Sequence, residues 1–222
     1  MTENGIKSKE RVRDHGEVFT PKHIVNDMLD LVKNETERID SRFLEPACGN
    51  GNFLAPILER KLVKVKEKYS SIQIEFERSA IIAVGSVYGV EILQDNIEAC
   101  IERLFNIVDE IYSKLYKDKC KEDFRHSIRF VLRRNILLGD ATTLRRPDNN
   151  EFIIFSQWSP VNGSMIKRVD YKFAELAEFN PKTPTLFSPK QISDTGEAVF
   201  LPEPTNEKFP LINYLSLGHE TN

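Results

Sequence analysis

A short apolar segment that runs into a glycine loop and then into a helix constrains the fold of this chain more than any other feature. Residues 42–44 (Arg-Phe-Leu) lead to Glu45, and the loop that follows carries Gly49 and Gly51. Apolar residues then recur at helical spacing from about Asn52. A strand, a glycine loop and a helix in this order open a nucleotide-binding sheet, so we predict an α/β fold with parallel strands.

The remainder of the chain continues this alternation of strands and helices. Two further predicted strands end in an acidic residue, Glu91 and Asp140. Thr20 and Pro21 are typical of a helix start. The apolar face that we expect for this helix consists of Ile24, Met28, Leu31 and Val32, with Val25 and Leu29 widening it. We predict strands at 86–90, 135–139 and 152–155, and helices at 95–116 and 124–133. We interpret the charged residues 63–79 as the end of the helix that starts near Asn52, followed by an exposed connection.

Composition excludes several classes of protein. Lys and Arg number 31 and Asp and Glu 34, so the net charge of −3 requires any nucleic-acid contact to use a local basic patch. No apolar run approaches the ~18 residues of a membrane span. The odd number and scatter of the cysteines suggest a reducing cytosol, so we expect a cytoplasmic protein. Three scattered cysteines and isolated histidines, among them His126 and His219, predict neither a disulfide framework nor a metal site.

The three acidic strand ends form the most informative pattern. In a doubly wound parallel sheet, Glu45, Glu91 and Asp140 share the edge where ligands bind. A carboxylate can accept hydrogen bonds from both ribose hydroxyls, and a second can accept from an adenine amino group. The loop lacks the Lys-Ser/Thr of a phosphate-binding loop and the third glycine of the dinucleotide fingerprint. We therefore predict S-adenosylmethionine as cofactor, with an ordinary turn and solvated acidic caps as the alternative.

Several motifs in order strengthen this prediction. The string from Phe43 to Phe53 (FLEPACGNGNF) resembles the cofactor motif of adenine-N6 DNA methyltransferases of restriction–modification systems. Residues 16–21 (GEVFTP) resemble the motif that precedes it in gamma-ordered members and type I modification subunits, and 88–91 (YGVE) and 138–141 (LGDA) resemble the motifs of the next strands. Ordered motifs are more specific than any one of them alone.

The resemblance implies a fold, a division of the chain and a set of site residues. The fold is the class I S-adenosylmethionine-dependent methyltransferase type, a Rossmann-like three-layer α/β sandwich, over residues 15–178. We expect a flexible N-terminal arm at 1–14 and a proline-rich C-terminal tail at 179–222. The implied cofactor-binding residues are Phe19, Thr20, Pro21, Glu45, Pro46, Cys48, Gly49, Gly51, Phe53, Glu91, Ile92, Asp140 and Ala141.

The acceptor side departs from the family pattern. These enzymes carry Asn/Asp/Ser-Pro-Pro-Tyr/Phe after the fourth strand, where the polar side chain holds the target amine and the aromatic ring stacks on a flipped base. Here Ser156, Gln157 and Trp158 occupy that place. Two hypotheses stay open: a divergent catalytic loop, or a buried tryptophan in a chain that binds cofactor and acts with a partner.

DNA is the expected partner, with a separate specificity or restriction subunit left open. Lys167 and Arg168 follow the catalytic position and are the first candidates for phosphate contact. Arginines at 125, 129, 133, 134, 145 and 146 form a second group, for which a solvated helix face is the alternative. A methyltransferase acting on a protein or a small molecule is a third possible function.

Overall fold

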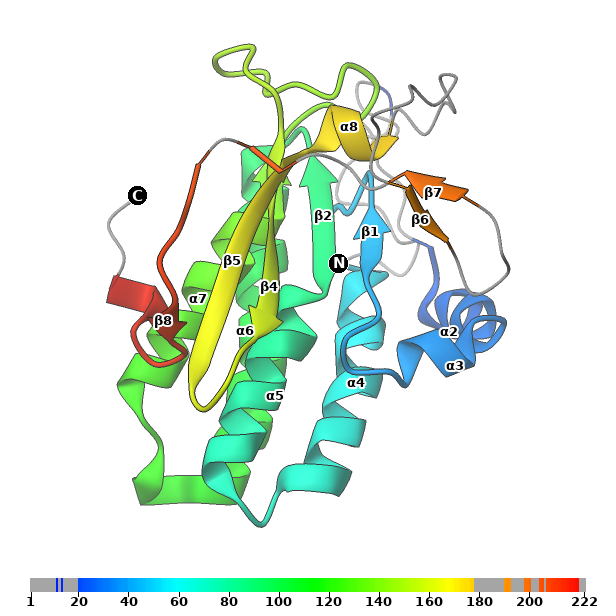
Figure 1. The fold of residues 1–222 in the computed structure, drawn as a ribbon. Helices are drawn as coiled ribbons and strands as arrows, with labels where there is room; N and C mark the ends of the chain where they lie inside the picture. The colour runs from blue at the N-terminus through cyan, green and yellow to red at the C-terminus, as the bar shows by residue number, and fades with distance from the viewer. Residues whose placement is uncertain are drawn as a thin grey trace.

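Three parallel strands form the central sheet of the computed structural model (Figure 1). The strands are β1 (Phe43–Glu45), β2 (Val87–Glu91) and β3 (Ile136–Leu138), in the order β1-β2-β3. In the register, Glu45 lies opposite Gly89 and Glu91 opposite Leu138. The structure describes Arg11, Arg13 and residues 20–177, 190–192, 198–200, 204–205 and 207–219. The prediction that the first three strands are parallel is confirmed.

Each crossover between these strands contains two long helices. Between β1 and β2 lie α4 (Leu54–Tyr69) and α5 (Gln73–Gly85), and between β2 and β3 lie α6 (Gln94–Tyr116), the 3-10 turn η1 (Lys117–Lys119) and α7 (Glu122–Asn135). The predicted continuation of the preceding helix into 63–79 is confirmed, since α4 runs to Tyr69. The exposed connection predicted after it is wrong, because α5 begins at Gln73 and buries Phe76 and Glu77 completely. The apolar face of this helix is difficult to recognise in the sequence, because charged residues alternate with the apolar ones.

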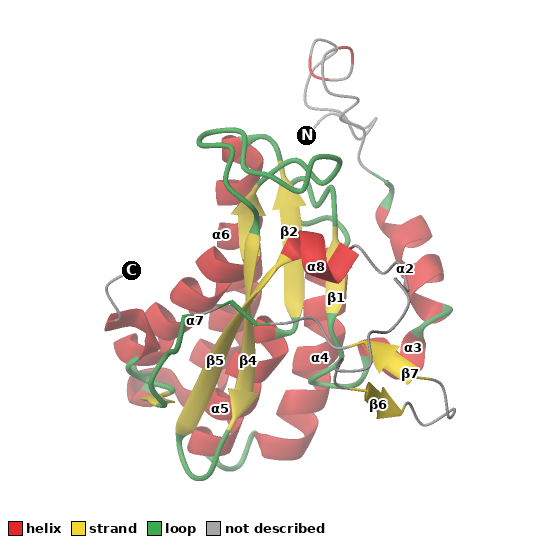
Figure 2. Ribbon diagram, turned by 45° about the horizontal axis from the view of Figure 1, so that its top comes forward, coloured by secondary structure: helices red, strands yellow, loops and turns green. Residues whose placement is uncertain are grey.

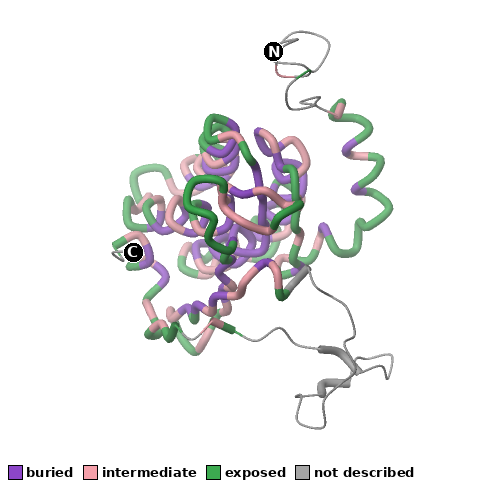
Figure 3. The backbone as a smooth tube through the Cα atoms, turned by 90° about the horizontal axis from the view of Figure 1, so that it is seen from above, coloured by how far each residue is buried: buried purple, intermediate pink, exposed green. Residues whose placement is uncertain are grey.

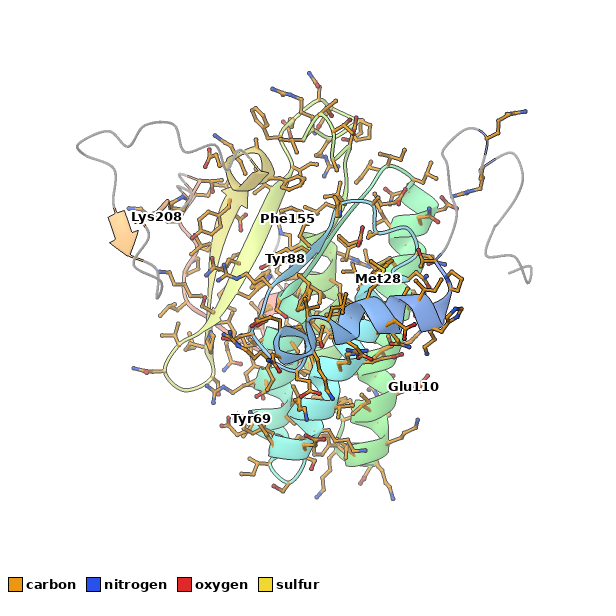
Figure 4. All side chains as sticks on the ribbon, turned by 90° about the vertical axis from the view of Figure 1, so that its right-hand side faces the viewer. Met28, Tyr69, Tyr88, Glu110, Phe155 and Lys208 are labelled. Atoms are coloured by element: carbon orange, nitrogen blue, oxygen red, sulfur yellow. The ribbon has the colours of Figure 1, made fainter. Side chains whose placement is uncertain are left out.

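The N-terminal helices lie beside α4. They are α2 (Lys22–Asp30) and α3 (Lys33–Thr36), and α2 begins one residue after Pro21. Its buried residues are Val25 and Leu29, whereas Ile24 is 41% and Met28 50% exposed. Figure 4 shows Met28 on the outer side of the molecule. The predicted apolar face is therefore buried only along its Val25 and Leu29 side, because the helix turns that side toward the core.

A second sheet is formed by β4 (Ile154–Pro160), β5 (Met165–Lys172) and β8 (Ile212–Asn213), in the order β4-β5-β8. The pairs β4–β5 and β5–β8 are antiparallel, and Gly163 adopts a φ of 68° in the turn of the hairpin. The helix α8 (Phe173–Ala177), the paired strands β6 (Lys190–Ile192) and β7 (Ala198–Phe200), and the turn η2 (Leu217–His219) complete the described elements. The prediction that residues 152–155 form a fourth strand of one parallel sheet is therefore wrong, because β4 belongs to a second, antiparallel sheet.

The direction of β4 is opposite to that of the central strands. A Cβ on Gly139, just after β3, would lie 2.3 Å from the side chain of Ile153, whereas one on Gly85, just before β2, would lie 2.8 Å from Trp158. Between these two points, the Tyr88 and Phe155 rings meet edge to face at 5.3 Å, in the region labelled in Figure 4. Strand β4 therefore runs from the carboxyl edge of the central sheet toward its amino edge, across its face (Figure 2).

Buried residues gather between the central sheet and the helices (Figure 3). The part of the tail at 207–219 also reaches this core, because Tyr214 and Leu217 are 2% and 1% exposed. This part of the proline-rich tail expected at 179–222 is therefore packed on the core. The predicted boundaries after residues 14 and 178 lie at undescribed positions. No helix among the described residues is long and apolar enough to cross a membrane.

A buried carboxylate joins four parts of the chain. Both side-chain oxygens of Glu77 accept hydrogen bonds, Oε1 from Gln73 and from the Tyr112 hydroxyl, and Oε2 from Lys121 Nζ at 2.8 Å and the Tyr214 hydroxyl at 2.5 Å. Burial alone would raise the pKa of Glu77, but these donors outweigh it and hold the pKa below its usual value. The network fixes α5, α6, the start of α7 and the C-terminal segment to one another.

We expect Glu77→Gln to lower the free energy of unfolding by about 3 kcal/mol, because it removes one partner of a buried ion pair. The depressed pKa predicts that this difference is fully present above the unfolded-state pKa of about 4.3 and is lost as pH falls through the folded-state pKa. Urea unfolding of both proteins between neutral and acid pH measures it.

Glu75→Gln is the matched control on the same helix. Glu75 pairs with Arg78 at 3.0 Å at the surface, so this variant should differ from the parent by less than about 1 kcal/mol. Equal losses in the two variants would contradict the role assigned to the buried network.

Candidate functional site

The loop between β1 and α4 is held against the end of β2. Cys48 N–H donates to Val90 O at 2.9 Å, and Gly51 N–H closes a turn onto Cys48 O at 2.9 Å. Gly49 and Gly51 adopt φ values of 51° and 82°, in the left-handed region that favours glycine. The two predicted glycines are therefore required by the shape of the loop itself.

Glu91 connects this loop to the sheet. Its Oε2 accepts from Gly49 N–H at 2.9 Å, and its Oε1 accepts from Leu93 N–H at 3.0 Å. Its backbone carbonyl accepts from Gly139 N–H at 2.9 Å, so the same residue also reaches the end of β3. Glu91 is only 8% exposed. The predicted convergence of the glycine loop and the second strand is present in the structure.

Glu45 and Asp140 lie on either side of Glu91. Both Glu45 and Glu91 are close enough to Cys48 that their charges help to raise the pKa of its thiol. Burial also raises the pKa of Glu45, while a hydrogen bond from Ala47 N–H opposes this. Asp140 follows the residue that donates to Glu91, and its Oδ1 accepts from the Thr142 hydroxyl and N–H, which lowers its pKa. The three carboxylates therefore occupy one edge of one sheet.

Two buried thiols pack behind the glycine loop. A Cβ on Gly51 would lie 2.8 Å from Cys100 Sγ, and one on Gly89 would lie 2.7 Å from Cys48 Sγ. The hydrogen bond with Cys100, followed by burial, raises the pKa of the Cys48 thiol. Cys48 therefore acts as a neutral apolar support of the loop, and its side chain is turned inward.

Two asparagines that were not among the predicted site residues also lie at the carboxyl edge of the sheet. Asn52 Nδ2 donates to Thr20 O, which brings Thr20 beside the glycine loop although 32 residues separate them. Asn50, between the two glycines, is 8% exposed, and its Oδ1 is buried without a hydrogen-bond partner. Their position beside required glycines is the signal that could have identified them. Phe19 lies outside the described residues.

The other predicted cofactor residues surround the same loop. Ile92 follows Glu91 and is 46% exposed. Pro21 and Pro46 are exposed, and Phe53 and Ala141 are half-buried. The structure thus leaves an apolar side chain accessible at the acidic edge.

The predicted catalytic residues lie elsewhere. Ser156 and Trp158 are buried on β4, at 1% and 6% exposure, and Gln157 is half-buried between them. Trp158 Nε1 donates to Asn135 Oδ1 at 3.2 Å, and its ring contacts Phe130 at 6.0 Å between centroids. Both contacts lie on α7, toward the amino edge of the central sheet. In this arrangement, Ser156 and Trp158 are part of the packing of β4 in the interior, and Gln157 Nε2 donates to Ser159 Oγ within the strand.

The two predicted phosphate contacts have different surroundings. Lys167 is exposed on β5. Arg168 is 6% exposed, donates to both carboxylate oxygens of Asp170 at 2.9 and 2.7 Å, and stacks on Phe209 at 3.8 Å. A group so fully engaged would have to leave Asp170 to contact a phosphate, so Lys167 is the better placed of the pair.

A basic cleft of about 660 Å³ lies along the outer strand β3. Its lining comes from α7, from β3, from the loop after Asp140 and from the C-terminal turn η2. The lining residues are His126, Arg129, Phe130, Arg133, Arg134, Leu137, Arg146, Gly218 and His219. Four of the six arginines singled out in the sequence therefore meet at one place, which is evidence against a uniformly solvated helix face.

Comparison with known proteins supports one family. The family model described as N-6 DNA Methylase matches residues 7–101, from the N-terminal segment through the glycine loop and β2 into α6. Neither the curated proteins nor the solved structures gave a match. The match covers the elements that carry Thr20, Glu45 and Glu91, and it ends before β3 and β4.

We expect Gly51→Ala to destabilise the fold by about 3 kcal/mol, because the new methyl group combines a left-handed backbone with a clash against Cys100 Sγ. The double variant Gly51→Ala/Cys100→Ala should be more stable than the sum of its single variants predicts, since the clash is gone. Thermal and urea unfolding measure both effects.

Gly163→Ala provides the matched control. Gly163 also has a positive φ, of 68°, but a Cβ there meets nothing within 4 Å. This variant should therefore lose only about 1 kcal/mol, the cost of the backbone conformation alone. A loss as large as that of Gly51→Ala would show that the close approach of Cys100 has no effect.

Proposed function

We propose that this chain, whose residues 7–101 match the family model described as N-6 DNA Methylase, binds S-adenosylmethionine at the acidic edge of the central sheet for adenine-N6 methylation of DNA in a restriction–modification system. The observation that carries this proposal is the Glu91 carboxylate, which bridges the glycine loop and the end of β2. The family match supports a DNA methyltransferase, and the residues at the edge suggest its cofactor.

The donors and acceptors at this edge fit the cofactor. S-adenosylmethionine carries positive charge on its sulfonium and amino groups, and Glu45, Glu91 and Asp140 provide the opposite sign. A carboxylate offers about four lone-pair positions, so Glu91 retains acceptor capacity for ribose hydroxyls beside its two N–H donors. The unpartnered Oδ1 of Asn50 is a further acceptor at the loop. Exposed Ile92 suits the face of an adenine ring.

The side chains can be given separate tasks on this basis. Glu45 would face the amino group, Glu91 the ribose and Asp140 the adenine amine, while Gly49 and Gly51 allow close approach of the backbone. Thr20, held by Asn52, would close over the methionine end. Bound S-adenosylmethionine supplies a methyl group on a sulfonium centre. The chain's contribution is alignment, since the positive charge of the sulfonium disappears during transfer.

The surroundings of the residues expected to hold the target base favour a methyltransferase that acts together with a partner. Ser156 and Trp158 are packed toward the amino edge, and β4 leads away from the carboxyl edge. We therefore propose that the chain forms the cofactor-binding part of the methyltransferase, and that residues other than Ser156, Gln157 and Trp158 receive the target base. A partner subunit is one source of such residues.

The basic cleft is the proposed contact for DNA phosphates. Arg133 is exposed at the cleft and forms no ion pair within the described residues, whereas Arg129 pairs with Glu102 and Arg146 with Asp148. The arginines of this cleft offer the local positive patch that a chain with a net charge of −3 needs to approach a polyanion.

We expect S-adenosylmethionine to raise the melting temperature of the purified chain, because a ligand bound only by the folded state stabilises it. Glu91→Gln should weaken binding about tenfold or more, since charge-assisted hydrogen bonds contribute roughly 1.5–3 kcal/mol. Calorimetric titration gives the dissociation constants.

Glu110→Gln is the control, because Glu110 is an exposed residue at the far end of α6, paired with Lys114 (Figure 4). No binding by the parent chain at saturating cofactor would reject the proposal. Transfer of a labelled methyl group to DNA is measured in parallel, with adenine analysed in the digested product. The chain alone would have to transfer methyl groups, and Gln157→Ala or Trp158→Ala would have to abolish this transfer while cofactor binding is retained, to show that these residues belong to the active site.

Arg133→Ala should weaken binding to a DNA duplex and lower the slope of log affinity against log salt by about 1, as loss of one phosphate contact does. Arg103→Ala removes a partly exposed arginine of α6 that does not line the cleft, and its slope should equal that of the parent. Fluorescence anisotropy over a salt series measures both slopes. Equal slopes for all three proteins would place the DNA contact outside the cleft.

A further inference from the structure

Three side chains from distant parts of the chain meet at one end of the basic cleft. Asp123 and His126 are three residues apart on α7 and therefore share a helix face. His219 comes from the turn η2, 93 residues after His126. One potential ligand atom from each residue lies within 4.8 Å of the others. Sequence reading treated both histidines as isolated, because nothing in their spacing shows that the C-terminal segment returns to α7.

The position of His219 is fixed by the segment that carries it. Tyr214 is anchored on Glu77, and Leu217 is 1% exposed. Gly218 lies so close to α7 that a Cβ there would be 2.6 Å from the backbone carbon of His126. Only glycine permits this approach, and the residue that follows it is His219. A buried tyrosine, a buried leucine and a required glycine thus hold an exposed histidine beside its two companions.

The contacts among the three residues leave ligand atoms available. His219 Nε2 lies 3.0 Å from Asp123 Oδ1, and the rings of His126 and His219 stand perpendicular with centroids 6.0 Å apart. All three side chains are exposed, so small rotations can bring their atoms together. In a tetrahedral zinc site, bonds of about 2.0–2.1 Å place ligand atoms about 3.4 Å apart, and the present separations lie within reach of that geometry.

We propose that Asp123, His126 and His219 form a binding site for a divalent transition metal ion of the zinc class. Two imidazoles and one carboxylate are a ligand set that zinc accepts, and three protein ligands leave one position open. That position faces the cleft, which His126 and His219 also line. The ion fastens the C-terminal segment to α7, and this role does not depend on cofactor binding or methyl transfer.

Positive charges near the cleft do not oppose a cation as strongly as their number suggests. Arg129 is engaged by Glu102 at 2.7 Å and lies over the Phe105 ring, and Arg146 is engaged by Asp148 at 2.6 Å. The remaining arginines favour an anionic or water ligand at the open position. Affinity below that of a structural zinc finger is therefore expected, since only three protein ligands contribute.

Zinc chloride titration of the full chain, without an affinity tag, tests the proposal. We expect one zinc ion per chain and a higher melting temperature in its presence. Asp123→Asn, His126→Ala and His219→Ala should each weaken binding by more than the roughly tenfold that loss of an outer-shell partner causes. Because the three residues are exposed, each variant should keep the melting temperature of the metal-free parent to within a few degrees.

Two control variants make the result decisive. His23→Ala removes an exposed histidine on α2, and Cys120→Ser removes a partly exposed thiol, and both should bind zinc as the parent does. Absence of zinc binding by the parent would overturn the proposal. Binding that survives all three substitutions in the cluster, or that is lost in either control variant, would overturn it equally.

Discussion

The buried Glu77 carboxylate is the interaction on which the arrangement of this molecule depends. Four donors from α5, α6, the start of α7 and the C-terminal segment meet on its two oxygens. A carboxylate in the interior is tolerated only when it is satisfied in this way. Because the donors come from segments distant in the sequence, their meeting sets the position of α7. That helix in turn carries Asn135, which holds Trp158, and His126, which meets His219.

The two edges of the central sheet present different side chains. At the carboxyl edge, Glu91 joins the glycine loop to the ends of β2 and β3, and Glu45 and Asp140 stay partly exposed. Toward the amino edge, α5 and α7 present an apolar surface that β4 covers with Trp158. An antiparallel hairpin meets this demand, because Trp158 on β4 packs against the helices while Phe155 packs on Tyr88 of β2. Because β4 covers this apolar surface, Ser156 and Trp158 lie away from the carboxyl edge, where we propose that the cofactor binds.

Local patterns predicted the part of the fold that local chemistry determines. The strand that ends at Glu45, the loop with Gly49 and Gly51, and the strand that ends at Glu91 all lie where their residue types require. The direction of β4 could not be predicted, because its apolar residues suit a parallel or an antiparallel strand equally well. The meeting of His126 with His219 depends on Tyr214 reaching Glu77, a contact over 137 residues that no spacing reveals.

The burial of Trp158 carries a consequence for how this chain could take part in base methylation. An aromatic ring that stacks on a flipped base must be solvent-accessible before the base arrives. Moving Trp158 to such a place would break its bond to Asn135 and expose an apolar surface over Gly85, and a large aromatic side chain buried to this extent contributes about 3 kcal/mol or more. A base stacked on one aromatic ring returns roughly 1–3 kcal/mol, which does not clearly exceed that loss. The energetics therefore favour a base-receiving surface formed by other residues, while the acidic edge of β1 and β2 keeps its shape.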